Sequence, residues 1–173
     1  MYQHILVVID GGPAADQALS EALKLAGDGC HLRVITVVEN PFAGYGIPAR
    51  TYGYTAVHEG LLQQGRQILD QVLRDTQHLD HLTIETHLID LGPDANADIA
   101  PAILADSEDY NADVIVMGTH GRSGVKRFFL GSVAEQVIRQ SHIPVLVVRE
   151  PVDQTQKQAL VRSVSPEMHS SLI

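Results

Sequence analysis

The stretch DVIVMGTHGRSGVKRFFLGSV, Asp113–Val133, decides the fold because it joins three patterns in a fixed order. It begins as a short, continuous apolar run, which is typical of a strand covered on both faces of a parallel sheet. A glycine-rich and basic segment follows, and Gly131-Ser132 then opens an amphipathic pattern. This order predicts a strand, a turn and a helix, with the turn at the carboxyl end of the strand. The turn's glycines and cations are Gly118, Gly121, Gly124, Gly131, Arg122, Lys126 and Arg127.

The rest of the chain repeats this alternation of strand and helix. The β-rich runs are His4–Asp10, His31–Val38, Leu82–Ile89, Asp113–Met117 and Pro144–Arg149. The helical patterns between them are Pro13–Ala26, Gly60–Gln77, Asp98–Tyr110 and Ser132–Ser141. Strands that alternate with helices predict an α/β fold with a parallel sheet and helices on both faces. The third run alternates polar and apolar residues, which places it at an edge of the sheet.

Two segments interrupt this rhythm. Asn40–Glu59 is long and rich in glycine, proline and tyrosine, and irregular segments of this length are often functional. Its tyrosines are Tyr45, Tyr52 and Tyr54. One interpretation is that they stack on a base or form a lid, and the simpler one is that they are partly buried loop aromatics. The polar tail, residues 150–173, is expected to lie outside a single domain formed by residues 1–149.

The composition of the chain indicates its cellular compartment and excludes some classes of partner. The chain has 12 basic and 21 acidic residues among its 173, and the net charge of -9 argues against broad binding to nucleic acid or anionic membranes. Cys30 is the one cysteine of the sequence, which fits a reducing compartment. No apolar run has the length of a membrane span. We therefore expect a cytoplasmic protein without membrane insertion.

The turn after the fourth strand has the chemistry of a phosphate-binding loop. Glycines let backbone N–H groups approach an anion, and a helix N-terminus supplies unpaired donors. Ser132 and Glu135 match a capping box, S-x-x-E, at the start of that helix. The Walker A, dinucleotide and nucleophile-elbow patterns are absent from the sequence, and Asp10-Gly11-Gly12-Pro13 follows the first strand instead.

At this point the sequence resembles a known family. The spacing Gly118-x2-Gly121-x9-Gly131-Ser132 is similar to the ATP-binding signature of universal stress proteins. The resemblance extends over residues 1–149, including the strand that ends in Asp10. It implies a single-domain, doubly wound five-stranded parallel sheet of strand order 3-2-1-4-5, Rossmann-like and adenine nucleotide alpha hydrolase-like. Many members have Gly-Ser after the first-strand aspartate, where this chain has Gly11-Gly12.

The resemblance also implies binding residues and partners. ATP, with or without Mg²⁺ or Mn²⁺, is the implied cofactor, and no catalytic or metal-ligating residue is expected. Residues for the adenosine part are Ile9 and Asp10, with Val38 contacting adenine through its backbone. Residues along the ribose and phosphate path are Met117, Gly118, His120, Gly121 and Arg122, followed by the phosphate ligands Gly131, Ser132 and Val133. The implied homodimer pairs through the fifth strand, at Val145, Leu146, Val147 and Val148.

The expected function is that of a nucleotide-responsive regulatory or stress-tolerance dimer. One alternative is a slow ATPase or other nucleotide-processing enzyme, for which Asp10 and His120 are candidate groups. Another is a phosphoacceptor of the response-regulator type, with Asp90 after the third strand. His78 and His81 have a spacing that could hold a metal, although surface histidines are the simpler interpretation.

Overall fold

The computed structural model describes residues 2–42, 53–93, 98–119 and 130–150, in which strands and helices alternate along the chain. The strands are β1 (His4–Val8), β2 (His31–Val38), β3 (Thr83–Asp90), β4 (Val114–Gly118) and β5 (Val145–Val148). The helices are α1 (Pro13–Leu25), α2 (Tyr54–Thr76), α3 (Ile99–Asp109) and α4 (Ser132–Gln140). The order of elements predicted from the sequence is confirmed.

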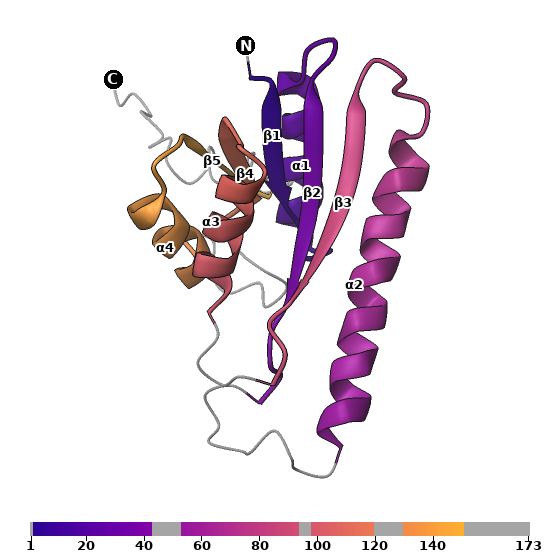
Figure 1. The fold of residues 1–173 in the computed structure, drawn as a ribbon, viewed down its shortest axis with the longest axis vertical. Helices are drawn as coiled ribbons and strands as arrows, with labels where there is room; N and C mark the ends of the chain where they lie inside the picture. The colour runs from indigo at the N-terminus through magenta and orange to yellow at the C-terminus, as the bar shows by residue number, and fades with distance from the viewer. Residues whose placement is uncertain (1, 43–52, 94–97, 120–129, 151–173) are drawn as a thin grey trace, which may run out of the picture.

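The strands form one parallel, five-stranded sheet in the order β3-β2-β1-β4-β5 (Figure 1). The chain builds outward from β1 to β3 and then crosses back to β4 on the other side of β1. The strand order therefore reverses between β1 and β4, and ligands of open α/β sheets bind at the carboxyl ends of strands beside such a reversal. The predicted strand order and edge position of β3 are confirmed.

Helices cover both faces of the sheet and divide the core into two layers. Residues of α1 and α2 pack with one set of strand side chains, and residues of α3 and α4 pack with the other. Ile5 and Leu6 are neighbours in β1 and both are 0% exposed, because successive side chains of a strand point to opposite layers. Figure 1 shows α3 and α4 together on the side of the sheet away from α2.

Helix α2 begins earlier than the sequence pattern predicted. It starts at Tyr54 instead of Gly60, so the end of the expected irregular segment is helical. Tyr54 and His58 lie one turn apart, both are buried, and their rings stack with centroids 5.2 Å apart. His58 Nε2 also lies 3.0 Å from Asp90 Oδ1 on β3, so tertiary contacts hold this first turn in place. Tyr45 and Tyr52 lie outside the described residues.

Gly65 explains how closely α2 approaches the sheet. A Cβ atom added there would lie 2.7 Å from Leu88 Cδ1 and 3.1 Å from Thr36 Cγ2. The missing side chain therefore lets the helix backbone pack against β2 and β3. Within the described part of the chain, the helices lack the combination of length and apolar character that a membrane crossing needs.

Candidate functional site

A cavity of about 700 Å³ opens at the carboxyl ends of β1, β2 and β4, beside the reversal of strand order. Its volume is in the range of small-molecule sites, which are mostly apolar with a few placed polar groups. Predicted binding residues that line it are Ile9, Asp10, Val38, Met117, Gly118, Gly131, Ser132 and Val133. The predictions for His120, Gly121 and Arg122 lie outside the described residues.

The start of α4 differs from the predicted capping box. Gly131 is the N-cap residue, in an extended conformation, and no side chain caps the helix. The N–H of Glu135 donates to the carbonyl of Gly131 at 2.9 Å, which makes Ser132 the first helical residue. The capping-box prediction was wrong by one position, because Gly131, which has no side chain, is the N-cap residue and Ser132 is already helical.

The backbone N–H of Gly131 is bonded to the end of the sheet. Its N–H donates to the carbonyl of Thr119 at 2.8 Å, and the N–H of Thr119 donates to the carbonyl of Val148 at 2.9 Å. The Gly131 N–H predicted to bind phosphate is thus already bonded within the protein. The first N–H groups of a helix have no intrahelical partner, so the donors of α4 are those of the next residues. These are Ser132, Val133 and Ala134, all of which line the cavity.

The turn after β1 is fixed by Asp10. Its Oδ1 accepts the N–H of Gly12 at 2.9 Å, and Gly11 between them has a φ of 79°, in the region that favours glycine. Pro13 then occupies the first turn of α1, where its missing N–H is tolerated. The local sequence Asp10-Gly11-Gly12-Pro13 therefore places a carboxylate at the mouth of the cavity.

Gly118 lets the end of β4 lie directly against α1. A Cβ atom built on it would be 3.0 Å from both the carbonyl carbon and the Cβ of Ala14. Few real Cβ contacts are this short, so a side chain here would push β4 and α1 apart. Gly118 therefore has a packing role in addition to its place in the cavity wall.

Sequence reasoning missed the walls contributed by α2 and α3. These wall residues are Leu61, Gln64, Gly65, Ile99 and Ile103. They lie far along the chain from the glycine loop, so no local motif connects them to it. Gly65, inside an otherwise regular helical pattern, was the one signal in the sequence, since a glycine there often marks close packing.

The alternation of β2 decides which backbone faces the cavity. The carbonyl of Ile35 accepts the N–H of Ile9, toward β1, whereas the carbonyl of Val38 accepts the N–H of Leu91, toward β3. In a parallel sheet, residues two apart in a strand bond to the same neighbour. The backbone N–H and carbonyl of Val37 therefore point toward the β1 side of β2, just beyond the end of β1. Val37 also lines the cavity.

The charges on the described wall are all negative. Asp10 and Glu39 are its acidic residues, and its described lining contains no lysine or arginine. Within the described lining, the feature that attracts an anion is the N-terminus of α4, where the helix dipole is positive. The cations of the glycine-rich segment, Arg122, Lys126 and Arg127, lie outside the described residues.

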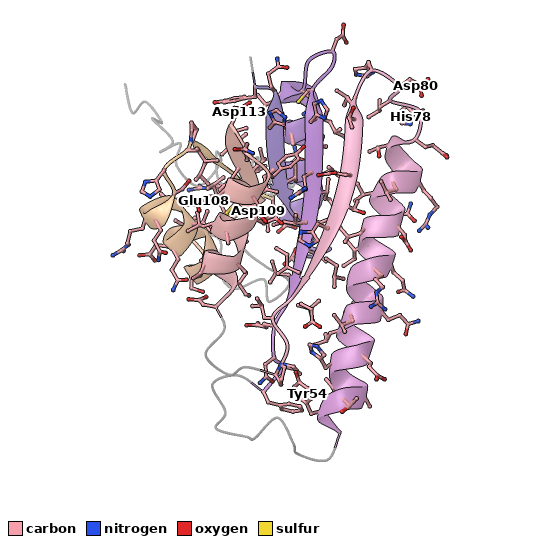
Figure 2. All side chains as sticks on the ribbon, viewed as in Figure 1. Tyr54, His78, Asp80, Glu108, Asp109 and Asp113 are labelled. Carbon is pink, nitrogen blue, oxygen red and sulfur yellow. The ribbon has the colours of Figure 1, made fainter. Side chains whose placement is uncertain are left out.

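Other predicted groups lie away from the cavity. Figure 2 shows His78 and Asp80 at the opposite end of α2 from Tyr54, and the lining of the cavity does not include them. Among the described residues, no group of three His, Cys, Asp or Glu side chains is placed to hold a metal ion. Asp90 Oδ1 accepts the N–H of Gly92 at 2.8 Å and contacts His58, so this carboxylate fixes the end of β3.

A doubly wound parallel sheet with a helix N-terminus beside a cavity at its reversal point defines the class of open α/β proteins, in which that point is the usual place for a ligand. The particular family follows from comparison with known sequences. The model of the universal stress protein family matches residues 1–149, and the chain belongs to that family. It is a stress-response family and not a defined class of enzymes.

Individual relatives agree with this assignment. A universal stress protein of Methanocaldococcus jannaschii is 34% identical over 153 residues, covering 87% of this chain and 84% of its own. Among solved structures, a universal stress family protein of Burkholderia pseudomallei is 27% identical with a TM-score of 0.67, over 85% of this chain and 96% of that one. The protein UspA of Lactobacillus plantarum has a TM-score of 0.72 at 22% identity, covering 86% and 98%.

Proposed function

We propose that this universal stress protein binds an adenine nucleotide, ATP with or without Mg²⁺ or Mn²⁺, and acts as a cytoplasmic, nucleotide-responsive dimer. The observation that carries the proposal is the position of α4. Its first three residues, Ser132, Val133 and Ala134, whose N–H groups have no partner within the helix, line the cavity at the reversal of strand order. A helix N-terminus of this kind is a ready site for phosphate.

The order of elements along the sheet suggests how the nucleotide lies. The phosphates meet α4 after β4, the ribose meets Asp10 after β1, and the base lies against the end of β2. Neighbouring strands are about 4.8 Å apart, so the site spans roughly 10 Å from β4 to β2. Val37 then supplies the backbone contact to the base that was predicted for Val38, whose carbonyl already bonds toward β3.

Proteins of similar fold support the ligand class. One structural relative is a universal stress protein in complex with cAMP, with a TM-score of 0.54. Another, from Arabidopsis thaliana, has AMP bound, with a TM-score of 0.61. The ligands of both contain an adenine, a ribose and a phosphate, which are the groups that we propose for the cavity of this chain.

The dimer part of the proposal rests on β5. This strand is at the edge of the sheet, and its Leu146 is 37% exposed although the sequence of the strand is wholly apolar. An uncovered apolar edge invites association, and pairing with a second copy would cover it. The predicted contact residues are Val145, Leu146, Val147 and Val148. We expect Leu146→Asp to give a monomer in sedimentation experiments, and a dimer that persists would contradict this interface.

Isothermal titration of the purified protein with ATP tests the nucleotide proposal. Micromolar affinity corresponds to about 8 kcal/mol, which backbone donors and base burial together can supply. Mass spectrometry of the protein as purified would reveal a bound nucleotide and identify it. Absence of binding at millimolar ATP, AMP and cAMP, with the fold intact by circular dichroism, would contradict the proposal.

A further inference from the structure

We propose that Glu39 determines base specificity, by accepting a hydrogen bond from the 6-amino group of adenine. The inference rests on the proposed nucleotide function and goes beyond it, because it names a side chain that selects the base. Glu39 directly follows β2, lines the cavity, and is exposed. Nothing in the sequence pattern alone singled it out.

The chemistry of the wall leads to this assignment. Asp10 and Glu39 are the charged residues of the described lining, and both are acidic. A carboxylate accepts hydrogen bonds and repels phosphate, so a ligand group that lies beside Glu39 is expected to be a hydrogen-bond donor and not a phosphate. Asp10 follows β1, next to β4 and the phosphate end, and is placed to meet the ribose hydroxyls.

Glu39 lies one strand further from the phosphate end. At that position the ligand presents its base, and the exocyclic amine is the N–H donor of adenine in a nucleotide. The apolar side chains Val37, Ile99 and Ile103 provide a wall for the ring beside it. The carboxylate can thus lie at the edge of the ring while the ring itself contacts apolar groups.

The backbone on either side of Glu39 is fixed. Val38 is the last residue of β2, and its carbonyl accepts the N–H of Leu91 at 2.9 Å. Asn40 is 3% exposed, donates from Nδ2 to the carbonyl of Pro93 at 3.1 Å, and accepts the N–H of Phe42 at 2.9 Å. The two anchored neighbours fix the position of the Glu39 backbone at the end of β2, so binding has only the side chain left to order.

The test compares ATP with purine riboside 5′-triphosphate, which carries hydrogen in place of the 6-amino group. We expect the native protein to prefer ATP by about tenfold to hundredfold, the range for a hydrogen bond to a charged group. Glu39→Ala should reduce that preference by at least about tenfold, and Glu39→Gln, which keeps a neutral acceptor, should be intermediate. Glu21→Ala removes a carboxylate from the exposed side of α1 and should keep the native preference.

The outcomes separate the two proposals. If the native protein binds ATP and Glu39→Ala keeps the full preference for it, the role of Glu39 is wrong and the nucleotide site stands. If the native protein binds neither triphosphate, both proposals fail. Guanine also presents N–H donors to a carboxylate, so tighter native binding of GTP than of ATP would overturn the adenine assignment. Thermal unfolding of each variant establishes that the fold is retained.

Discussion

The two ends of the sheet use aspartate in different ways. At the amino end, the Asp113 carboxylate accepts the N–H groups of Gln3 and His4, at 2.7 and 2.9 Å, and so ties β4 to β1. At the carboxyl end, Asp10 accepts the N–H of Gly12 within its own turn, and its neighbourhood opens into the cavity. Figure 2 shows Asp113 at the end of the molecule opposite Tyr54.

The difference follows from topology. At the amino end, β1 and β4 begin side by side, and the backbone of Asp113 also donates to the carbonyl of His4 at 2.8 Å. At the carboxyl end, the segments after β1 and β4 lead to helices on opposite faces of the sheet. Helices α1 and α4 therefore begin on opposite faces of the sheet, and residues of both line the cavity. Substitutions at the amino end should therefore change stability, and those at the carboxyl end should change binding.

Gly118→Val should have the largest effect, because Gly118 both packs β4 against α1 and lines the cavity. The new side chain would press on Ala14, which already leaves only 3.0 Å for a Cβ atom. We expect a loss of about 2 to 3 kcal/mol in the free energy of unfolding, measured by urea denaturation, together with weaker nucleotide binding. Gly118→Ala should show a smaller loss. Unchanged stability of both variants would contradict the close packing of β4 on α1.

Ser132→Pro should affect binding alone. Proline is favoured in the first position of a helix, and the φ of -63° and ψ of 151° at Gly131 suit a residue that precedes proline. The change removes one N–H donor, so we expect nucleotide affinity to fall by about tenfold to hundredfold in calorimetry. Ser132→Ala is the control, because it removes the hydroxyl and keeps the N–H. Loss of affinity in both variants to the same extent would assign the effect to the hydroxyl.

Asp113→Ala should affect stability alone, with a dependence on pH. The N–H groups of His4 and Gln3 hold the pKa of the Asp113 carboxylate below its usual range. The carboxylate therefore stabilises the folded protein above the pKa of the unfolded chain, and this contribution is lost as pH falls through the folded pKa. We expect a loss of about 1 kcal/mol at pH 7, since the group is exposed. The difference in the free energy of unfolding between the variant and the native protein should shrink at about pH 3, below the ordinary pKa of aspartate. Nucleotide affinity should not change.

Tyr54→Phe should have the smallest effect. The Tyr54 hydroxyl is buried and has no hydrogen-bond partner in the described part of the chain, and burial raises its pKa, so it stays neutral. Removing a buried hydroxyl of this kind should leave stability unchanged or raise it by less than about 1 kcal/mol. Differential scanning calorimetry measures the change. A clear loss of stability would show that the hydroxyl has a partner in solution.

Much of the fold could be predicted from the sequence, because each element carries its own periodicity. Continuous apolar runs such as Val114–Met117 identified buried strands, and the polar alternation of 82–89 identified an edge. The start of α2 could not be predicted, because glycine and tyrosine around residue 54 are typical of loops. Stacking of Tyr54 on His58, and the contact of His58 with Asp90, outweigh that local preference.

The sequence by itself determined the alternation of strands and helices, and the presence of a helix after the glycine-rich segment that follows β4. These features depend on residues near one another in the chain, whose patterns are legible without a structure. Only the tertiary structure decided which backbone donors of α4 remain available, since Gly131 bonds to Thr119. It also decided that Val37, Glu39 and α3 share one cavity, because the contacts that gather them join segments far apart in sequence.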